Sequence, residues 1–223
     1  MRVEVCADAA TAARRGAEVI AEAAREAVAD RGVFTLAVSG GRSPWRMYAG
    51  LADLGMPWAQ TEVFQVDERV APSGDPERNW EHALEALPIP RLRAAHPMPV
   101  TAADLDAAAA SYEASLPDSL DLVHLGLGPD GHTASLVPGD PVLAVTDRRV
   151  APTAAPYQGR RRMTLTYPGL ASARRLLWLV TGDDKREALR LLRAGDRTIP
   201  AARVEIRDAI LVADAAASGR DGA

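Results

Sequence analysis

Residues 126–132, Gly-Leu-Gly-Pro-Asp-Gly-His, combine three glycines with a carboxylate and an imidazole. The apolar residues just before them are typical of a strand that is covered on both faces. Glycines permit positive φ angles and leave backbone N–H groups uncovered, so a ligand can approach the chain closely. Asp130 and His132 would lie beyond the carboxyl end of this strand, where open α/β sheets bind ligands. The alternative is that Asp130 caps a helical turn from Thr133 and that His132 is an ordinary surface residue.

A second glycine-rich turn, Ser39 to Pro44, also follows an apolar segment, residues 33–38. Ser43 is expected to cap the next helix and Pro44 to occupy its first position, which leaves free N–H groups that attract phosphate. The turn lacks the Gly-Lys-Ser/Thr of a Walker loop and the glycine spacing of dinucleotide-binding proteins. The alternative is a tight strand-to-helix turn that binds nothing.

Charged residues follow two further strands. Asp67, Glu68 and Arg69 come directly after the strand expected at residues 62–66, although they could be solvated loop charges. Lys185 is the only lysine among 26 basic residues, and it is expected in the first turn of a helix. A cation there opposes the helix dipole, so a bound anion would compensate for it. The alternative is that this lysine is present by chance, at a solvated helix end, and binds nothing.

Strand and helix patterns alternate along the chain. Strands are expected at residues 3–6, 33–38, 62–66, near 96, 122–127, 161–166, 174–180 and 209–212, and helices at residues 9–29, 45–54, 79–87, 104–115 and 185–193. This alternation predicts an α/β fold: a mostly parallel, doubly wound, Rossmann-like sheet with helices on both faces. We expect a single domain, residues 1–223, with residues 215–223 as a loose tail and residues 140–160 as a lid or rim. The segments at Ser39, Asp67, Asp130 and Lys185 each follow a strand and are expected to converge at one edge of the sheet.

Composition and charge argue against several classes of protein. With 48% hydrophobic residues the chain can bury a full core. Its net charge of −4, with no run of Lys and Arg that resembles a phosphate-backbone stripe, argues against a nucleic-acid partner. No apolar run is long enough to span a membrane, and the charged N-terminus is unlike a signal peptide. The single cysteine, Cys6, cannot form an internal disulfide, and the four histidines lack zinc-type spacing. We therefore expect a cytoplasmic protein without a metal site.

Together, these segments resemble the 6-phosphogluconolactonase family, whose fold is related to that of glucosamine-6-phosphate deaminases. The matching segments are Ser39–Pro44, Phe64–Val70 with Asn79 downstream, Gly126–Gly139, Arg162–Thr166, Thr181–Lys185 and Leu211–Ala217. The likeness covers nearly the whole chain in order, and residues 130–136 are its most specific part. The chain departs from the family pattern at Arg42, where Ser or Thr is common, at Arg78, where Ser is usual, and at Val137, where Phe is common.

The resemblance implies hydrolysis of a small sugar-phosphate lactone, 6-phosphoglucono-1,5-lactone, to 6-phosphogluconate in the oxidative pentose phosphate route, without an organic cofactor. A lactone is an activated ester, so a positioned water and a base suffice, and the chain has no G-x-S-x-G nucleophile motif. Neutral His132 is the natural proton acceptor, and Asp130 or Asp67 could orient it or the substrate hydroxyls. Turn N–H groups around Gly128, or Arg69, could stabilise the oxyanion. The phosphate would be held by Ser39, Gly40, Gly41, Ser43 and Lys185, with Arg162 as a further candidate.

Two other functions are compatible with parts of the sequence. A glucosamine-6-phosphate isomerase/deaminase would share the fold and the phosphate loop, but that family resembles Asp-Gly-His-Ile-Ala-Phe-Asn-Glu. Its glutamate has no match in the Thr-Ala-Ser-Leu that follows His132 here. A non-catalytic sugar-phosphate sensor would keep Lys185 and Gly40 but would not need His132, and no helix-turn-helix is apparent. We expect a monomer or a weak homo-oligomer without a nucleic-acid or membrane partner.

Overall fold

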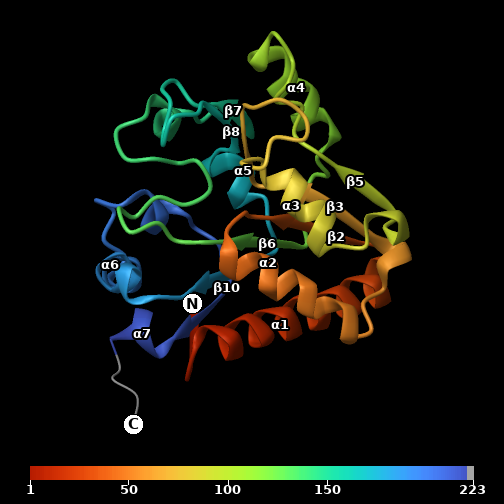
Figure 1. The fold of residues 1–223 in the computed structure, drawn as a ribbon, viewed down its shortest axis with the longest axis vertical. Helices are drawn as coiled ribbons and strands as arrows, with labels where there is room; N and C mark the ends of the chain where they lie inside the picture. The colour runs from red at the N-terminus through yellow and green to blue at the C-terminus, as the bar shows by residue number, and fades with distance from the viewer. Residues whose placement is uncertain (220–223) are drawn as a thin grey trace.

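A seven-stranded sheet forms the centre of the computed structural model, which describes residues 1–219 (Figure 1). Every neighbouring pair of strands in it is parallel. In spatial order the strands are β1 (Arg2–Cys6), β10 (Asp208–Asp214), β9 (Arg175–Val180), β6 (Leu122–Leu125), β2 (Phe34–Val38), β3 (Thr61–Gln65) and β5 (Ala94–His96). The two middle strands, β6 and β2, are buried along their whole length. The parallel α/β sheet expected from the sequence is confirmed.

The order of the strands reverses between β2 and β6. From β2 the chain builds outward through β3 to β5, and it then returns to β6 and builds in the other direction through β9 to β10. The loops after β2 and β6 therefore diverge, and a crevice opens between them at the carboxyl ends of the strands. Both glycine-rich turns, residues 39–44 and 126–132, begin at this crevice.

Helices cover both faces of the sheet (Figure 1). α1 (Ala9–Arg31), α2 (Arg42–Ala49) and α3 (Asn79–Ala86) share one hydrophobic core with the sheet. α4 (Leu105–Ser115), α5 (Tyr167–Ala171), α6 (Arg186–Ala194) and α7 (Ala215–Ser218) share the core on the other face. Short 3-10 turns lie at η1 (Gly50–Asp53), η2 (Trp58–Gln60), η3 (Ile89–Arg91), η4 (Pro141–Ala144), η5 (Asp183–Lys185) and η6 (Pro200–Arg203). None of the helices within residues 1–219 is long and apolar enough to cross a membrane.

A second, three-stranded sheet stands beside the crevice. It consists of β4 (Asp67–Arg69), β8 (Arg162–Leu165) and β7 (Val150–Pro152), all paired antiparallel. The sequence analysis expected the 161–166 strand but not this separate sheet, because the pairing of β4 with β8 joins segments almost a hundred residues apart. In this register Asp67 pairs with Thr164 and Arg69 with Arg162. The small sheet therefore carries Asp67, Arg69 and Arg162 to the same place.

Three local expectations from the sequence are wrong. Ser43 does not cap α2, because Gly41 adopts a φ of 123° and the helix starts two residues earlier than expected, at Arg42. Residues 215–218 are not loose, because they form α7, which is capped by the Asp214 carboxylate through the Ala217 N–H at 2.8 Å. Residues 220–223 of the expected tail lie outside the described part of the chain. The segment 140–160, expected to be a loop-like lid or rim, is not loop throughout, because it contains η4 and β7.

Candidate active site

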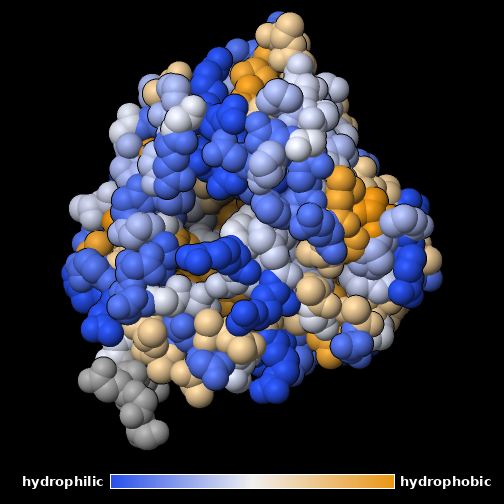
Figure 2. Space-filling model, in the orientation of Figure 1, coloured by the Kyte–Doolittle hydropathy of each residue, from blue (hydrophilic) through white to orange (hydrophobic). Residues whose placement is uncertain are grey.

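A cavity of about 350 Å³ lies at the crevice between the carboxyl ends of β2 and β6. Figure 2 shows a hollow rimmed by hydrophilic side chains where β6 and the start of α2 lie in Figure 1. Of the expected site residues, all but Asp130 line the cavity: Ser39, Gly40, Gly41, Ser43, Asp67, Arg69, Gly128, His132, Arg162 and Lys185. The expected convergence of segments distant in sequence is confirmed, while the role of each residue stays a prediction.

His132 and Asp130 form a close pair at the turn after β6. His132 Nδ1 lies 2.5 Å from Asp130 Oδ1, and the His132 backbone N–H donates to the same oxygen at 3.2 Å. The alternative of a helix cap is wrong, because residues 133–136 form a bridged turn rather than a helix. With Nδ1 engaged by the carboxylate, Nε2 is the nitrogen left to accept a proton from a ligand in the cavity.

The charge state of Asp130 suits this arrangement. Burial raises its pKa, but the charge and hydrogen bonds of His132 and the Tyr157 hydroxyl outweigh that effect, so the pKa lies below its ordinary value. Asp130 is therefore ionised at neutral pH and accepts the Nδ1–H proton. An imidazole held in this way presents the unprotonated Nε2 as a base, as in histidine–carboxylate pairs of hydrolases.

Glycine is required at position 128 by the imidazole itself. A Cβ atom there would clash with the His132 ring and would lie 2.7 Å from Asp130 Oδ1. The Gly128 N–H donates to the His132 carbonyl at 2.8 Å, and the Gly131 N–H donates to the Gly128 carbonyl at 3.0 Å. The Gly128 N–H itself closes the turn and is not free to bind an oxyanion, while the expectation that other N–H groups of this turn, or Arg69, stabilise one stays a prediction.

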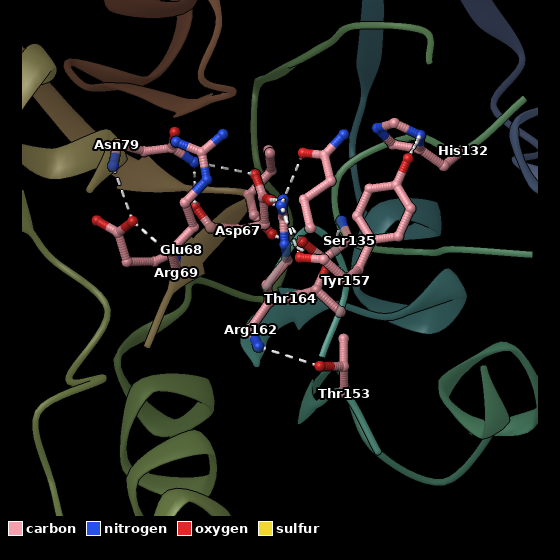
Figure 3. Close-up of polar contacts among 12 residues, drawn as sticks. Asp67, Glu68, Arg69, Asn79, His132, Ser135, Thr153, Tyr157, Arg162 and Thr164 are labelled. Carbon is pink, nitrogen blue, oxygen red and sulfur yellow. Dashed lines mark hydrogen bonds and ion pairs between the residues drawn. The ribbon is translucent and has the colours of Figure 1, made fainter. Parts of the chain in front are cut away.

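Asp67 belongs to the opposite wall of the cavity, as Figure 3 shows. Its buried carboxylate accepts the Ser135 hydroxyl at 2.6 Å and lies 3.9 Å from the Arg162 guanidinium. Within residues 1–219 no hydrogen bond joins Asp67 to His132. Of these two carboxylates, only Asp130 therefore contacts the imidazole and can orient it. Burial lowers the pKa of Arg162 and the Asp67 charge opposes this, but a guanidinium keeps its charge at any physiological pH.

Asn79 is a cavity residue that the sequence analysis named only as part of the family resemblance. It donates to the Asp67 carbonyl at 3.1 Å, and its amide lies so near Gly40 that a Cβ atom there would clash with it. Glu68, fully buried, accepts the backbone N–H groups of Asn79 and Trp80 at 2.8 Å each. Glu68 therefore caps α3 rather than acting as a solvated loop charge. In the sequence this carboxylate lies eleven residues before the start of the helix. That separation is too long for any local capping motif, so no signal of the cap was present in the sequence.

His124 and Tyr48 support the loop after β2. The Tyr48 hydroxyl lies 2.7 Å from His124 Nδ1 and accepts the Ser39 N–H at 3.1 Å, while the Ser39 hydroxyl donates to the His124 carbonyl at 2.9 Å. Burial lowers the pKa of His124 to about 3, so this imidazole is neutral at physiological pH. The hydroxyl and the backbone N–H of Ser39 are thus both engaged within the protein, and a contact of Ser39 with a ligand stays a prediction.

The remaining wall of the cavity is cationic. Lys185, in η5 just before α6, lies 2.9 Å from the Asp184 carboxylate, and its side chain keeps 22% of its surface exposed. Ser43 and Thr181 join the loops after β2 and β9 through their hydroxyls at 2.6 Å. The charged residues that line the cavity are Arg42, Arg69, Arg162 and Lys185 against Asp67 and Asp184. A chain with net charge −4 thus builds a locally positive site, which suits an anionic ligand.

The profile of the family described as "Glucosamine-6-phosphate isomerases/6-phosphogluconolactonase" matches residues 7–212. The chain belongs to this family. It is 39% identical, over 178 residues, to a 6-phosphogluconolactonase of Synechocystis sp., and the match covers 74% of this chain and 73% of the relative.

Two solved structures in this family show how little the fold says about the reaction. A 6-phosphogluconolactonase from Shewanella baltica has a TM-score of 0.86 at 22% identity, covering 96% of this chain and 97% of the other. A monomeric glucosamine-6-phosphate deaminase has the same TM-score of 0.86 at 20% identity, covering 99% and 100%. Both activities within the family therefore share this architecture, and the choice between them rests on the residues of the site.

Proposed function

We propose that this protein hydrolyses 6-phospho-D-glucono-1,5-lactone to 6-phospho-D-gluconate, the second step of the oxidative pentose phosphate route. The observation that carries the proposal is the His132–Asp130 pair at the same cavity as Lys185 and the glycine loop after β2. The name of the Synechocystis relative supports it. Thr133 to Leu136 after the histidine, without a glutamate, disfavours the deaminase.

The proposed reaction uses water as nucleophile. His132 Nε2 takes a proton from the water as its oxygen attacks C1 of the lactone, and Asp130 stabilises the imidazolium that forms. The negative charge on the former carbonyl oxygen is stabilised by a guanidinium, for which Arg69 is the candidate among the cavity residues. The C1–O5 ring bond then breaks, the imidazolium returns the proton to O5, and the new acid ionises to the product carboxylate.

The phosphate is proposed to lie at the start of α2, near Lys185. The first N–H groups of a helix have no partner within it, and at this end the helix dipole favours an anion. Pro44 has no N–H, so Arg42 and Ser43 supply the N–H groups nearest the loop. Arg42, where the family often has Ser or Thr, adds a charge to this end of the cavity.

Lys185→Ala is expected to raise KM about 10- to 100-fold, the loss of one charge-assisted hydrogen bond, with kcat within about threefold of the original. The phosphate is remote from the reacting carbon, so its contacts bind substrate and transition state alike. Arg193→Ala, which removes a positive charge from the following helix, α6, outside the cavity, serves as the control. Steady-state kinetics with both variants decide the matter, and an unchanged KM in Lys185→Ala would refute the phosphate role.

The activity itself is tested by generating the phosphorylated lactone in situ and comparing its disappearance with the uncatalysed rate. Glucosamine 6-phosphate is the control substrate, with release of ammonia as the readout. Lactone turnover alone supports the proposal, ammonia release would favour the deaminase, and binding of 6-phosphogluconate without turnover of either would favour a sensor. The proposal includes a single-domain cytoplasmic enzyme, a monomer or weak homo-oligomer, without organic cofactor, metal, nucleic acid or membrane partner.

A further inference from the structure

A tight turn between β7 and β8 brings Tyr157 to the His132–Asp130 pair. Tyr157 and Arg160 form an antiparallel bridge, with the Tyr157 N–H donating to the Arg160 carbonyl at 2.9 Å. Between them Gln158 has a φ of 52° and Gly159 a φ of 82°, the two left-handed residues of a type I′ hairpin turn. Neither the family resemblance nor the proposed mechanism assigns a role to this turn.

The Tyr157 side chain contacts both members of the pair, and Figure 3 shows its hydroxyl beside the His132 ring. Its hydroxyl donates to Asp130 Oδ2 at 3.1 Å and lies 3.3 Å from His132 Nδ1. Its ring meets the imidazole edge-on, with the ring centres 5.2 Å apart, and the Arg162 guanidinium lies 5.1 Å from the centre of the tyrosine ring. One side chain thus touches the base, its carboxylate partner and a cation of the cavity wall.

We propose that Tyr157 is a positioning residue of the active site, whose hydroxyl holds the Asp130 carboxylate against His132 Nδ1. This inference rests on the proposed lactone hydrolysis. The two carboxylate oxygens have different partners, His132 at Oδ1 and Tyr157 at Oδ2, so the plane of the carboxylate is held from both sides. Asp130 is the most exposed member of the group, with 37% of its side-chain surface accessible, and without the hydroxyl it is free to turn toward water. His132 would then lose the partner that keeps the proton on Nδ1 and the lone pair on Nε2.

The protonation states agree with this direction of hydrogen bonding. Burial raises the pKa of Tyr157, and the Asp130 charge raises it further, while Arg162 opposes them. The phenol therefore keeps its proton at neutral pH and can donate it to the carboxylate. Asp130, whose pKa lies below its ordinary value, is the acceptor.

The backbone of the turn is held independently of the hydroxyl. Arg160 binds the Glu77 carboxylate at 2.7 Å and the Asp75 carboxylate at 3.1 Å, which fastens the turn to the loop after β4. Arg162 donates to the Tyr157 carbonyl and to Gln158 Oε1, both at 3.3 Å. Tyr157→Phe consequently removes one hydrogen-bond donor and leaves the turn, the ring contact with His132 and the Arg162 contact in place.

Tyr157→Phe is expected to lower kcat about tenfold, the loss of a hydrogen bond to a charged group, with KM within about twofold. Tyr167→Phe is the matched control, because the Tyr167 hydroxyl donates to the Pro200 carbonyl at 3.0 Å, outside the cavity, and kcat should not change. A kcat in Tyr157→Phe equal to that of the original protein overturns the proposal.

A double-mutant cycle tests whether the hydroxyl acts through Asp130. In an Asp130→Asn background Tyr157→Phe should have no further effect on kcat, because the interaction it removes is already broken. A tenfold loss in both backgrounds would mean that the hydroxyl acts elsewhere, and it would overturn the proposal.

The ¹⁵N NMR signals of His132 report the same coupling without turnover. The proton should reside mainly on Nδ1 in the original protein and shift toward Nε2 in Tyr157→Phe, while Tyr167→Phe leaves the signals unchanged. If the original protein fails to hydrolyse the lactone, the proposed function falls and the NMR result alone decides whether Tyr157 positions the pair. An unaltered His132 spectrum in Tyr157→Phe contradicts the positioning role.

Discussion

His132→Gln is expected to lower kcat by a factor of about 10²–10⁴, the range contributed by a well-placed general base. Glutamine is close in size to histidine, but its side-chain amide cannot accept the proton of the attacking water. The affinity for 6-phosphogluconate should stay within about twofold, because the proposed phosphate contacts, at Lys185 and the start of α2, do not involve His132. Product binding by calorimetry and lactone turnover by a coupled assay give the two quantities separately.

His82→Gln is the matched control for this experiment. His82 lies on α3 with 39% of its side-chain surface accessible, and it is not among the cavity residues. Its substitution should leave kcat unchanged. If His132→Gln turned over the lactone as fast as the original protein, the general-base role would be excluded, and the His132–Asp130 pair would need a different explanation.

Gly128→Ala is expected to lower kcat about 100-fold through displacement of the imidazole, since a misplacement of about 1 Å at a reacting group costs on that order. The φ angle of Gly128 is not in the left-handed region, so alanine is allowed by the backbone. The new methyl group would overlap the His132 ring and lie 2.7 Å from Asp130 Oδ1. Both side chains must therefore shift away from residue 128. The melting temperature should change little, because the clash can be relieved by a partly exposed side chain.

Gly50→Ala is the control for this prediction. A Cβ atom at position 50 would lie 3.7 Å from the Ala17 Cβ, which is an ordinary contact. Gly50 has a helical φ of −66°, and it does not line the cavity. Thermal melting and kcat should both stay close to those of the original protein. If Gly128→Ala retained full turnover, His132 would not need its present position, and the geometry proposed for the base would be wrong.

Local patterns accounted for most of the main sheet and its helices. The helix α1 begins after Asp8, whose carboxylate accepts the Thr11 N–H at 2.7 Å, and ends at Gly32 with a φ of 75°. Apolar runs such as Phe34–Val38 became buried parallel strands, because a strand covered on both faces needs apolar residues at every position. These signals lie within a few residues of one another, so the sequence displays them directly.

Long-range pairing was beyond local patterns. Glu68 caps a helix that starts eleven residues later, and β4 pairs with β8 almost a hundred residues away. Gly41 starts α2 at Arg42, and the Ser43 hydroxyl then binds Thr181 in a distant loop rather than capping its own helix. In each case two conformations were compatible with the local residues, and a contact with a remote segment selected one of them.

The sequence alone identified the candidate groups of the site: an imidazole and a carboxylate on a glycine turn, a second glycine-rich turn and a single lysine, each at the end of a strand. Parallel strands place their carboxyl ends at one edge, so the convergence of these groups followed from the strand pattern. Only the tertiary structure decided which carboxylate holds His132, because Asp67 and Asp130 are equivalent in a sequence but face different neighbours in the fold. The same is true of Tyr157, whose place beside His132 depends on a hairpin turn and on Arg160, which binds the loop after β4.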